Sequence, residues 1–425
     1  YEIPCRDWSS DVCSSDLTEQ LIKEASRCLN CPTKPCMMAC PARNPIPEFM
    51  QKIKAGALSE ADDLWHKTSN LPELCGLLCP QETLCEGSCT LNRIGKPLKI
   101  GYLETEIAKL FPGKVRYPEI KNGRMHLVIG LGPAGMANAM RMAELGYDVT
   151  AIEADRQMGG AIYHSVPDFR FDDHELAIYE QRFDRLGITV NYHTTVGRDV
   201  LLADLIDLYD SIFIAHGLDI PVPVEIEHDD LVVYYAIDLL QKRKYSAEHL
   251  QKILGHKVGI IGLGFVAIDM ARTLIRLGKD VEIIYRRVMA EAPASMKEIE
   301  AAKAEGVKIN ELYGPVRFFK QETAKILDCE RTCLIHDSSS SRSRIAVVPG
   351  EAGQFELDDL IFATGQMSSD LVLKGSGVRI GADCGGCGTN NAKIFVGGDR
   401  VNRDKRIVDA MVSGIRVADL IASRK

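Results

Sequence analysis

The sequence predicts an α/β protein in which a small, all-α, cysteine-rich domain precedes two dinucleotide-binding βαβ domains, the second inserted into the first. Two observations support this. Eight of the 14 cysteines lie between Cys28 and Cys89, and a strand, glycine motif, helix and strand follow one another twice, from Met125 and from Lys257. A length of 425 residues fits about three domains.

The composition and net charge argue against nucleic-acid-binding and membrane-spanning proteins. Hydrophobic residues make up 46% and charged residues 26% of the chain, which is ordinary for a globular protein. The net charge of −8 argues against sequence-independent nucleic-acid binding. The longest apolar run, Val258 to Ile268, is too short to span a membrane, and no secretory signal is present. We expect a cytoplasmic protein without nucleic-acid or membrane partners.

Residues 7–17 read DWSSDVCSSDL, which is one reading frame of a sequencing-library adapter. We therefore expect residues 1–17 to be an artefact joined to a truncated gene, and exclude Cys5 and Cys13 from the argument. The alternative is a natural tail rich in Ser and Asp.

The remaining N-terminal cysteines form two blocks. They read C-x2-C-x4-C-x3-C-P and C-x3-C-P-x4-C-x3-C, and consist of Cys28, Cys31, Cys36 and Cys40, then Cys75, Cys79, Cys85 and Cys89. The first block is similar to the bacterial ferredoxin run, in which thiolates hold cluster iron. Disulfides are disfavoured without a secretory signal, and structural zinc fits the closing Cys-Pro units less well. Iron–sulfur binding is the preferred interpretation; zinc and unrelated thiols remain open.

The segment around these cysteines has helical periodicity at residues 46–57, 61–68 and 102–110. Residues 112–122 contain two Pro, one Gly and several charges and are expected to be a linker. The cysteine-rich helical domain is therefore placed at residues 18–120.

The first βαβ unit has strands at 125–129 and 148–152 and a helix that ends at Leu145. In its motif, Gly130 would form the tight turn, Gly132 would allow a pyrophosphate to approach, and Gly135 would allow close helix–strand packing. Glu153, at the end of the second strand, is placed to bind a ribose hydroxyl. A purely structural glycine turn is the alternative.

The second unit has strands at 257–261 and 280–285 and a helix that ends near Leu277. Its motif residues are Gly262, Gly264 and Ala267. Here the second strand ends in Arg286 and Arg287 rather than an acid, which favours the 2′-phosphate of NADPH, although NADH remains possible. An exposed basic strand end is the alternative.

Two dinucleotide sites in one chain indicate a flavin and a nicotinamide. A strand at 359–364 leads to Gly365, a strand at 394–396 leads to Gly398 and Asp399, and a helix at 408–421 would close over the cofactor. We expect FAD-binding segments at 121–222 and 357–425, with an inserted NAD(P)H-binding domain at 223–356.

The chain resembles the glutamate synthase small (beta) subunit family, including the related small subunit of NAD(P)-dependent dihydropyrimidine dehydrogenase. The resemblance runs from about Ile22 to the C-terminus. It rests on TSNLPELCGLLCPQETLCEGSCTLN (residues 68–92), supported by EASRCLNC, YRR, ATG and GGD. It implies an N-terminal domain with two [4Fe-4S] clusters and a glutathione-reductase-like pair of domains for FAD and NAD(P)H.

The resemblance also implies a ligand set. One cluster would be held by Cys28, Cys31, Cys36 and Cys89, and the other by Cys40, Cys79, Cys85 and Glu104. Cys75 is then a spare thiol beside the second cluster and a rival to Glu104, because a carboxylate is an unusual ligand for cluster iron.

Three positions depart from the family pattern. Phe265 stands where relatives usually have Asp or Asn, Ser165 replaces a Gly after Gly159 and Gly160, and His216 precedes Gly217. Gly160 is still expected to bind cofactor. Cys384 and Cys387, in a glycine-rich loop, are interpreted as incidental thiols, with metal binding as the alternative.

The expected activity is hydride transfer from NADPH to FAD, followed by release of single electrons through the two clusters, with no catalytic acid or base. A partner with FMN or iron–sulfur centres would accept the electrons. Alternatives are a free-standing NADPH:ferredoxin-type oxidoreductase and a non-catalytic iron–sulfur scaffold. A thiol reductase would need a cysteine pair at the flavin, yet residues 156–221 contain no Cys, and Cys329 and Cys333 are poor substitutes.

Overall fold

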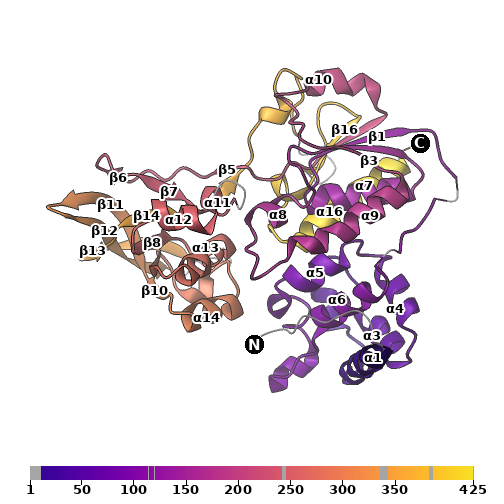
Figure 1. The fold of residues 1–425 in the computed structure, drawn as a ribbon, viewed down its shortest axis with the longest axis horizontal. Coiled ribbons are helices and arrows are strands. Elements are labelled where there is room, and N and C mark those ends of the chain that lie inside the picture. Colours follow the sequence, from indigo (N-terminus) through magenta and orange to yellow (C-terminus); the bar gives the residue numbers. More distant parts are fainter. Residues whose placement is uncertain are drawn as a thin grey trace. The chain divides into compact units, whose positions relative to one another are not determined.

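The structure, a computed structural model, describes residues 11–112, 114–118, 120–241, 246–335, 343–381 and 386–424, with side chains from residue 16 onward. Residues 1–10 of the expected artefact and Cys384 lie outside this range. The chain forms two compact units (Figure 1). Unit 1 comprises the described residues up to Met158, then 173–217 and those from 371 onward, and unit 2 comprises 159–172 and 218–370.

The cysteine-rich part of unit 1 consists of short helices joined by cysteine-bearing loops. They are α1 (Asp11–Ala25), α2 (Pro35–Ala39), α3 (Ile46–Lys54), α4 (Leu58–Trp65), α5 (Pro72–Leu78) and α6 (Ile100–Leu110), with the 3-10 turns η1 (Gln81–Thr83) and η2 (Thr90–Ile94). Proline in the first turn of α2, α3 and α5 helps to start these helices. α4 begins and ends three residues before the predicted bounds, because sequence periodicity alone does not fix helix ends.

The core of this helical part is small. Phe49 and Trp65, whose ring centroids are 4.3 Å apart, pack with Leu21 and Leu103, all of them almost fully buried. α1 runs without a break across residues 11–17, and Leu17 packs at the edge of this core. The artificial origin of residues 1–17 stays a prediction.

The first glycine motif of unit 1 belongs to a five-stranded parallel sheet of order β16-β4-β1-β2-β3. The strands are β1 (Met125–Ile129), β2 (Asp148–Ile152), β3 (Thr189–Asn191), β4 (Ser211–Ile214) and β16 (Ile394–Val396). α7 (Pro133–Glu144) connects β1 to β2, and α9 (Ala177–Leu186), α10 (Leu202–Leu205) and α16 (Ile407–Ser423) complete this part. The bounds of β1 and β2 are those predicted.

Unit 2 contains a second parallel sheet of order β10-β9-β8-β14-β7. Its strands are β7 (Val233–Tyr235), β8 (Lys257–Ile261), β9 (Asp280–Tyr285), β10 (Lys308–Glu311) and β14 (Asp359–Phe362), and its helices are α11 (Ala236–Leu239), α12 (Ala247–Ile253), α13 (Phe265–Arg276) and α14 (Met296–Ala304). β14 was expected to open the second FAD-binding segment. It instead pairs with β8 and β7, because its fully buried residues fit the centre of this sheet.

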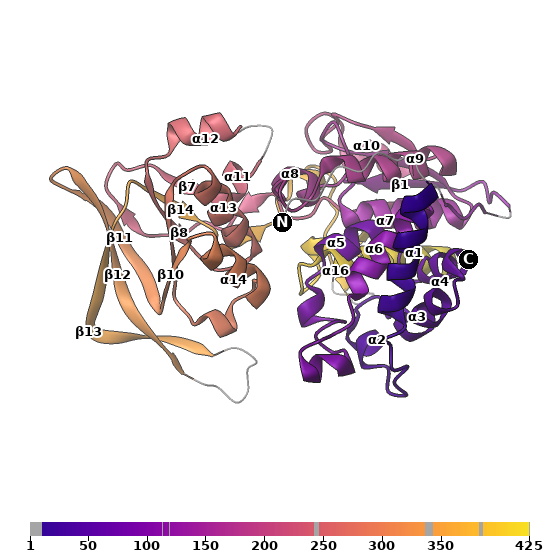
Figure 2. The same cartoon turned by 60° about the horizontal axis from the view of Figure 1, so that its bottom comes forward.

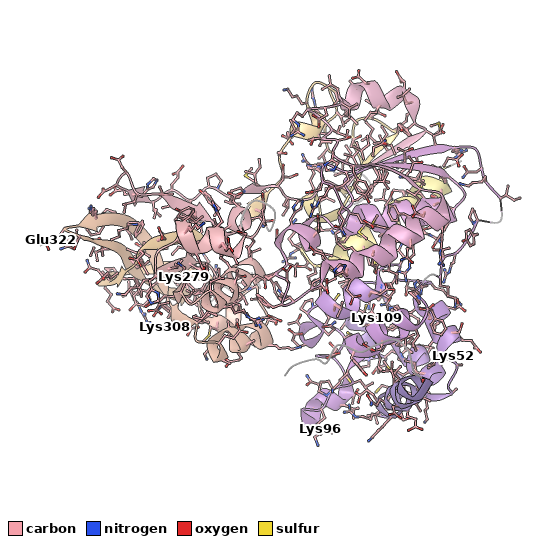
Figure 3. All side chains as sticks on the ribbon, in the orientation of Figure 1. Lys52, Lys96, Lys109, Lys279, Lys308 and Glu322 are labelled. Carbon is pink, nitrogen blue, oxygen red and sulfur yellow. The ribbon has the colours of Figure 1, made fainter. Side chains whose placement is uncertain are left out.

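Unit 2 also carries a four-stranded arm of order β13-β12-β11-β6 that the sequence did not predict (Figure 2). β13, β12 and β11 are antiparallel, and β6 pairs with β11 in parallel. Its strands are β6 (Glu227–His228), β11 (Tyr313–Gln321), β12 (Ala324–Ile335) and β13 (Arg344–Glu356). Glu322 lies at the tip of the β11–β12 hairpin (Figure 3). A two-stranded ribbon of β5 (Ile220–Pro221) and β15 (Gln366–Met367) completes the unit. In the part of the chain that is described, no helix combines the length and the apolar character needed to cross a bilayer.

A buried polar network ties the elements of the first sheet together. The ring of His126 on β1 is hydrogen-bonded to Ser211 Oγ (2.7 Å) and to Asn138 Oδ1 (2.9 Å), and Asn138 Nδ2 donates to the Gly414 carbonyl (3.0 Å). Burial lowers the pKa of His126 from 6.5 to about 4, although the two hydrogen bonds oppose the shift. The folded protein therefore keeps this imidazole neutral.

This shift predicts a pH dependence of stability. Because the unfolded chain binds a proton on His126 near pH 6.5 and the folded chain only near pH 4, its contribution is complete above pH 6.5 and is lost as the pH falls toward 4. We expect His126 to lower the free energy of unfolding by about 2 kcal/mol between pH 7 and pH 5. Denaturant titrations at both pH values measure this. The free energy of unfolding should fall by about 2 kcal/mol more in wild type than in His126→Gln between pH 7 and pH 5. An equal fall in both proteins would contradict the prediction.

Candidate cofactor and iron–sulfur sites

Four of the predicted ligands gather around one cavity. This first cysteine cavity is lined by Cys28, Cys31, Cys36 and Cys89, together with Leu29, Lys34, Pro35, Pro47, Thr90, Leu91 and Leu98. Cys31 Sγ lies 3.1 Å from Thr90 Oγ1, and the backbone amide of Asn30 lies 3.5 Å from Cys28 Sγ. Cys89 therefore joins three cysteines of the other block, about 50 to 60 positions earlier in the chain.

The other predicted ligands line a second cysteine cavity. Its wall consists of Cys40, Cys75, Cys79, Cys85 and Glu104, with Pro41, Asn44, Ile46, Trp65, Gln81, Leu84, Ile100 and Val408. Cys40 thus faces a different cavity from Cys36, although only three residues separate them. Cys36 lies within α2, whereas Cys40 follows the last helical residue, Ala39, with an extended backbone, so the two side chains do not share one helix face.

The second cavity offers five donors where a cubane needs four. Glu104 Oε1 accepts a hydrogen bond from Trp65 Nε1 at 2.8 Å, and the carboxyl is almost fully buried. Burial and the nearby Cys79 hold the pKa of Glu104 well above its ordinary range. A hydrogen bond with Cys79 and burial raise the pKa of Cys75. Both groups remain candidates for the fourth position.

Burial makes several of the thiols in the two cavities poor acids. Burial raises the pKa of Cys36 and of Cys40 to about 11, and holds that of Cys85 well above its ordinary value. Several buried thiolates become stable only when cations share the cavity, so these donors fit a positively charged iron–sulfur core. Among the residues that the structure describes, no three His, Cys, Asp or Glu side chains converge on one point as ligands of a single metal ion do.

The first glycine loop has the backbone that a dinucleotide requires. Gly130 has φ +89°, and a Cβ there would lie 2.8 Å from the Ala215 carbonyl oxygen. A Cβ on Gly135 would lie 1.9 Å from the Gly130 carbonyl oxygen, so the helix can approach only without a side chain. Gly132 is the N-cap of α7, whose first amides are directed toward the loop.

Glu153 closes the far side of this loop. Its carboxylate accepts hydrogen bonds from the amides of Leu131 (2.6 Å) and Asp155 (2.9 Å), and it is almost fully buried. These bonds hold the acid beside the glycine turn, the position from which it would meet an adenosine ribose.

The loop after β16 holds polar atoms that lack partners. In the described residues, Asp399 Oδ1 and Asn402 Nδ2 are buried without a hydrogen-bond partner, and burial raises the pKa of Asp399 to about 6. A bound group with both donors and acceptors would satisfy them, as the polar chain of FAD does. Gly398 beside them has φ +69°. Gly160 (φ +54°) and Gly365 (φ +120°) belong to unit 2.

The second glycine loop lies in unit 2 between β8 and α13. Gly262 has φ +121°, and a Cβ there would lie 2.6 Å from the Ala363 carbonyl oxygen. Gly264 is the N-cap of α13 and has open space around its Cα, whereas Ala267 is fully buried where the helix packs on the sheet. Phe265 is the first residue of α13, so the departure from the family pattern lies at the helix N-terminus.

The two arginines after β9 have different environments. Arg287 is largely buried and donates to Glu291 Oε2 (2.7 Å) and to the Ser343 carbonyl (2.7 Å). The side chain of Arg286 is exposed. Arg287 thus has a structural contact, and the prediction of a 2′-phosphate contact at this strand end rests on the exposed Arg286.

We expect Arg286→Ala to lower kcat/KM for NADPH by roughly 10- to 100-fold, because one charge-assisted bond to the 2′-phosphate is lost. The value for NADH should not change. Steady-state oxidation of both nucleotides with a dye acceptor measures this, and Arg287→Ala, tested for thermal stability as well, is the matched comparison. An equal fall with both nucleotides would show that Arg286 does not read the phosphate.

Sequence reasoning missed a buried ion pair beside the second cysteine cavity. Arg182 on α9 donates to Glu73 on α5 through Nη1 (3.0 Å) and Nη2 (2.5 Å), and Tyr179 Oη donates to Glu73 Oε2 at 2.6 Å. Glu73 and Tyr179 are 0% exposed and Arg182 is 2% exposed. The one charged residue of the otherwise apolar stretch LPELCGLL, Glu73, was the only hint of a buried partner. Trp65, the partner of Glu104, was likewise missed.

Two known families match successive parts of the chain. The family described as dihydropyrimidine dehydrogenase domain II, 4Fe-4S cluster, matches residues 6–114. This match favours the iron–sulfur interpretation over zinc. It begins within residues 1–17, the stretch expected to be an artefact. The pyridine nucleotide-disulphide oxidoreductase family matches residues 124–414. The predicted order of an iron–sulfur domain before a dinucleotide-binding pair is confirmed.

Individual relatives cover most of the chain. It is 30% identical over 423 residues to the glutamate synthase [NADPH] small chain of Escherichia coli, covering 93% of this chain and 89% of that one. It is also 30% identical to an NAD-dependent dihydropyrimidine dehydrogenase subunit PreT homolog of Salmonella typhi, covering 94% and 93%. Mycobacterium tuberculosis FprA in complex with NADPH has a similar fold, with a TM-score of 0.56 and 17% identity over 70% of this chain and 84% of that one. The chain is therefore an oxidoreductase of the pyridine nucleotide-disulphide oxidoreductase family, in the group that includes glutamate synthase small chains and PreT subunits.

Proposed function

We propose that this protein takes a hydride from NADPH onto FAD and passes the electrons, one at a time, through two [4Fe-4S] clusters to a larger partner subunit. The ligands would be Cys28, Cys31, Cys36 and Cys89 for one cluster, and Cys40, Cys79, Cys85 and either Glu104 or Cys75 for the other. FAD would occupy the loops at Gly130 and Asp399, and NADPH the loop at Gly262. When bound, the cofactors supply the redox chemistry, and the chain supplies their position and surroundings.

The observation that supports this most directly is a shared helix. Val408, in the first turn of α16, is part of the wall of the second cysteine cavity. The same helix follows the Gly398–Asp399 loop and crosses α7 so closely that a Cβ on Gly414 would lie 2.2 Å from the Ala134 carbonyl oxygen. Ala134 belongs to the first glycine motif. One rigid pair of helices therefore connects the proposed FAD loops to the second cavity (Figure 1).

The helices also exclude water from this connection. Met411 on α16 contacts the α5 side of the second cavity, with its sulfur 4.0 Å from Cys75 Sγ and 3.3 Å from Ser69 Oγ. All three side chains are buried. A dry, packed route keeps the reduced cofactors from reacting with solvent.

The partner is proposed from the relatives' names, a glutamate synthase small chain and a dihydropyrimidine dehydrogenase subunit, each of which implies a larger assembly. The second candidate is a free-standing NADPH:ferredoxin-type oxidoreductase. It would use the same FAD and NADPH loops and pass its electrons to a separate one-electron carrier.

Anaerobic purification of the full chain tests the proposal. We expect one flavin and about eight iron atoms per chain, the content of two cubanes. Addition of NADPH should bleach the flavin and produce the electron paramagnetic resonance signal of reduced clusters. Reduction of the flavin without any cluster signal would refute the proposed route. Co-purification with the product of a neighbouring large-subunit gene would separate the two candidates.

A further inference from the structure

Two large apolar side chains beside the first cysteine cavity are exposed to solvent. Leu29, between two of the cysteines, helps to line the cavity and is nonetheless 59% exposed. Ile94, at the end of η2 and five residues after Cys89, is 68% exposed. Leu29 therefore borders both the proposed cluster site and the solvent.

A hollow of about 470 Å³ opens beside the same cavity. It is lined by Asn30, Cys31, Pro32, Lys34, Glu48, Gln51 and Lys52. Cys31 borders both the hollow and the first cysteine cavity. A side chain of another protein placed in this hollow would lie one residue from the proposed cluster.

Positive charge surrounds this region although the chain as a whole is acidic. Residues 27–54 contain five Lys or Arg and one acid, and residues 91–99 contain three Lys or Arg and no acid, in a chain with net charge −8. The two segments are neighbours, since the Arg27 guanidinium donates to the carbonyls of Lys96 (2.5 Å) and Pro97 (3.4 Å). Figure 3 shows Lys96 at the end of the helical part of unit 1.

These cations differ in whether a described acidic residue pairs with them. Lys34 pairs with Glu48, and Lys52 pairs with Glu60. Within the described ranges, no acidic side chain forms an ion pair with Lys54, Arg93, Lys96 or Lys99, all of which are exposed. Protein–protein interfaces commonly have an apolar core surrounded by a polar rim. Exposed apolar side chains surrounded by these cations fit that pattern.

We propose that this surface, the basic docking face of Leu29, Ile94, Lys54, Arg93, Lys96 and Lys99, binds an electron-accepting protein that carries an acidic rim around its own redox centre. The inference rests on the proposed function, and it adds where the electrons leave and what kind of protein receives them. Opposite charge would steer the acceptor and speed its association, while the apolar centre would bring the two redox centres close together. Each NADPH would reduce two molecules of a one-electron acceptor, yielding NADP⁺ and one proton.

Two haem proteins of opposite charge serve as probes: the soluble domain of cytochrome b5, whose haem edge is ringed by acids, and cytochrome c, whose haem edge is ringed by lysines. We expect NADPH-dependent reduction of cytochrome b5 to be fast at low salt and to slow steeply as salt increases. The double variant Arg93→Glu/Lys96→Glu should lower kcat/KM for cytochrome b5 roughly tenfold and raise it for cytochrome c. Lys374→Glu, an exposed lysine of the same unit outside the face, is the matched control and should behave as wild type.

The readouts separate this inference from the proposed function. Flavin bleaching and cluster reduction by NADPH, followed by stopped flow and electron paramagnetic resonance, should be the same in all variants. If the clusters are not reduced in wild type, the proposed function fails. If they are reduced but the double variant and Lys374→Glu reduce cytochrome b5 equally well, the docking face is wrong. Preference of wild type for cytochrome c would also overturn it.

Discussion

Cys79→Ser should still take hydride from NADPH but deliver electrons to a protein acceptor at less than about one hundredth of the wild-type rate. Cys79 lines the second cysteine cavity, which shares α16 with the proposed FAD site. A serine hydroxyl is a hard, weakly acidic donor and does not replace thiolate on cluster iron. Without this cluster the route from the flavin to the first cavity is interrupted. Iron should fall from about eight to about four per chain.

The control for this change is another buried cysteine. Cys329, on β12 of unit 2, is 2% exposed and lies outside both cysteine cavities, so Cys329→Ala should keep its full iron content and activity. Unchanged iron in Cys79→Ser would contradict the proposed ligand set. Glu104→Gln and Cys75→Ser, compared in the same assay, identify the fourth donor as the one whose loss alters the spectrum of the second cluster.

Arg182→Met should lower the free energy of unfolding by about 3–5 kcal/mol, the largest stability effect we expect from one substitution. Burial alone would raise the pKa of Glu73, yet the charge of Arg182 and the hydrogen bonds from Arg182 and Tyr179 hold it below its ordinary value. Removal of the guanidinium leaves a buried carboxylate without its counter-charge. The ion pair connects α5 of the helical part to α9 beside the first sheet, so its loss should separate these parts of unit 1.

Anaerobic urea titration measures this loss, and two further variants control it. Lys52→Ala removes the ion pair between Lys52 and Glu60, whose side chains are 45% and 63% exposed, respectively. This variant should lose less than about 1 kcal/mol of unfolding free energy. The double variant Glu73→Leu/Arg182→Leu should recover part of the stability, because no unpaired charge remains. If Arg182→Met and Lys52→Ala were equally stable, the buried pair would contribute no more than a surface one.

The elements of the two glycine motifs could be predicted residue by residue. The observed bounds of β1, β2, β8 and β9 are those predicted. Strand periodicity and the need for glycine at a positive φ, as at Gly130 and Gly262, are local properties that neighbouring residues already express. The clustering of cysteines in the first hundred residues was equally visible, and it led to the iron–sulfur family that the comparison confirms.

The tertiary structure decided which distant residues meet. Spacing groups Cys40 with Cys36, whereas the fold places Cys40 in a cavity with Cys79 and Cys85. It also brings Trp65 to Glu104, Glu73 to Arg182, and β14 to the second sheet rather than the first. Such contacts join residues tens to more than a hundred positions apart. They are selected by the burial of whole helices and strands, so no short stretch of sequence contains the information that specifies them.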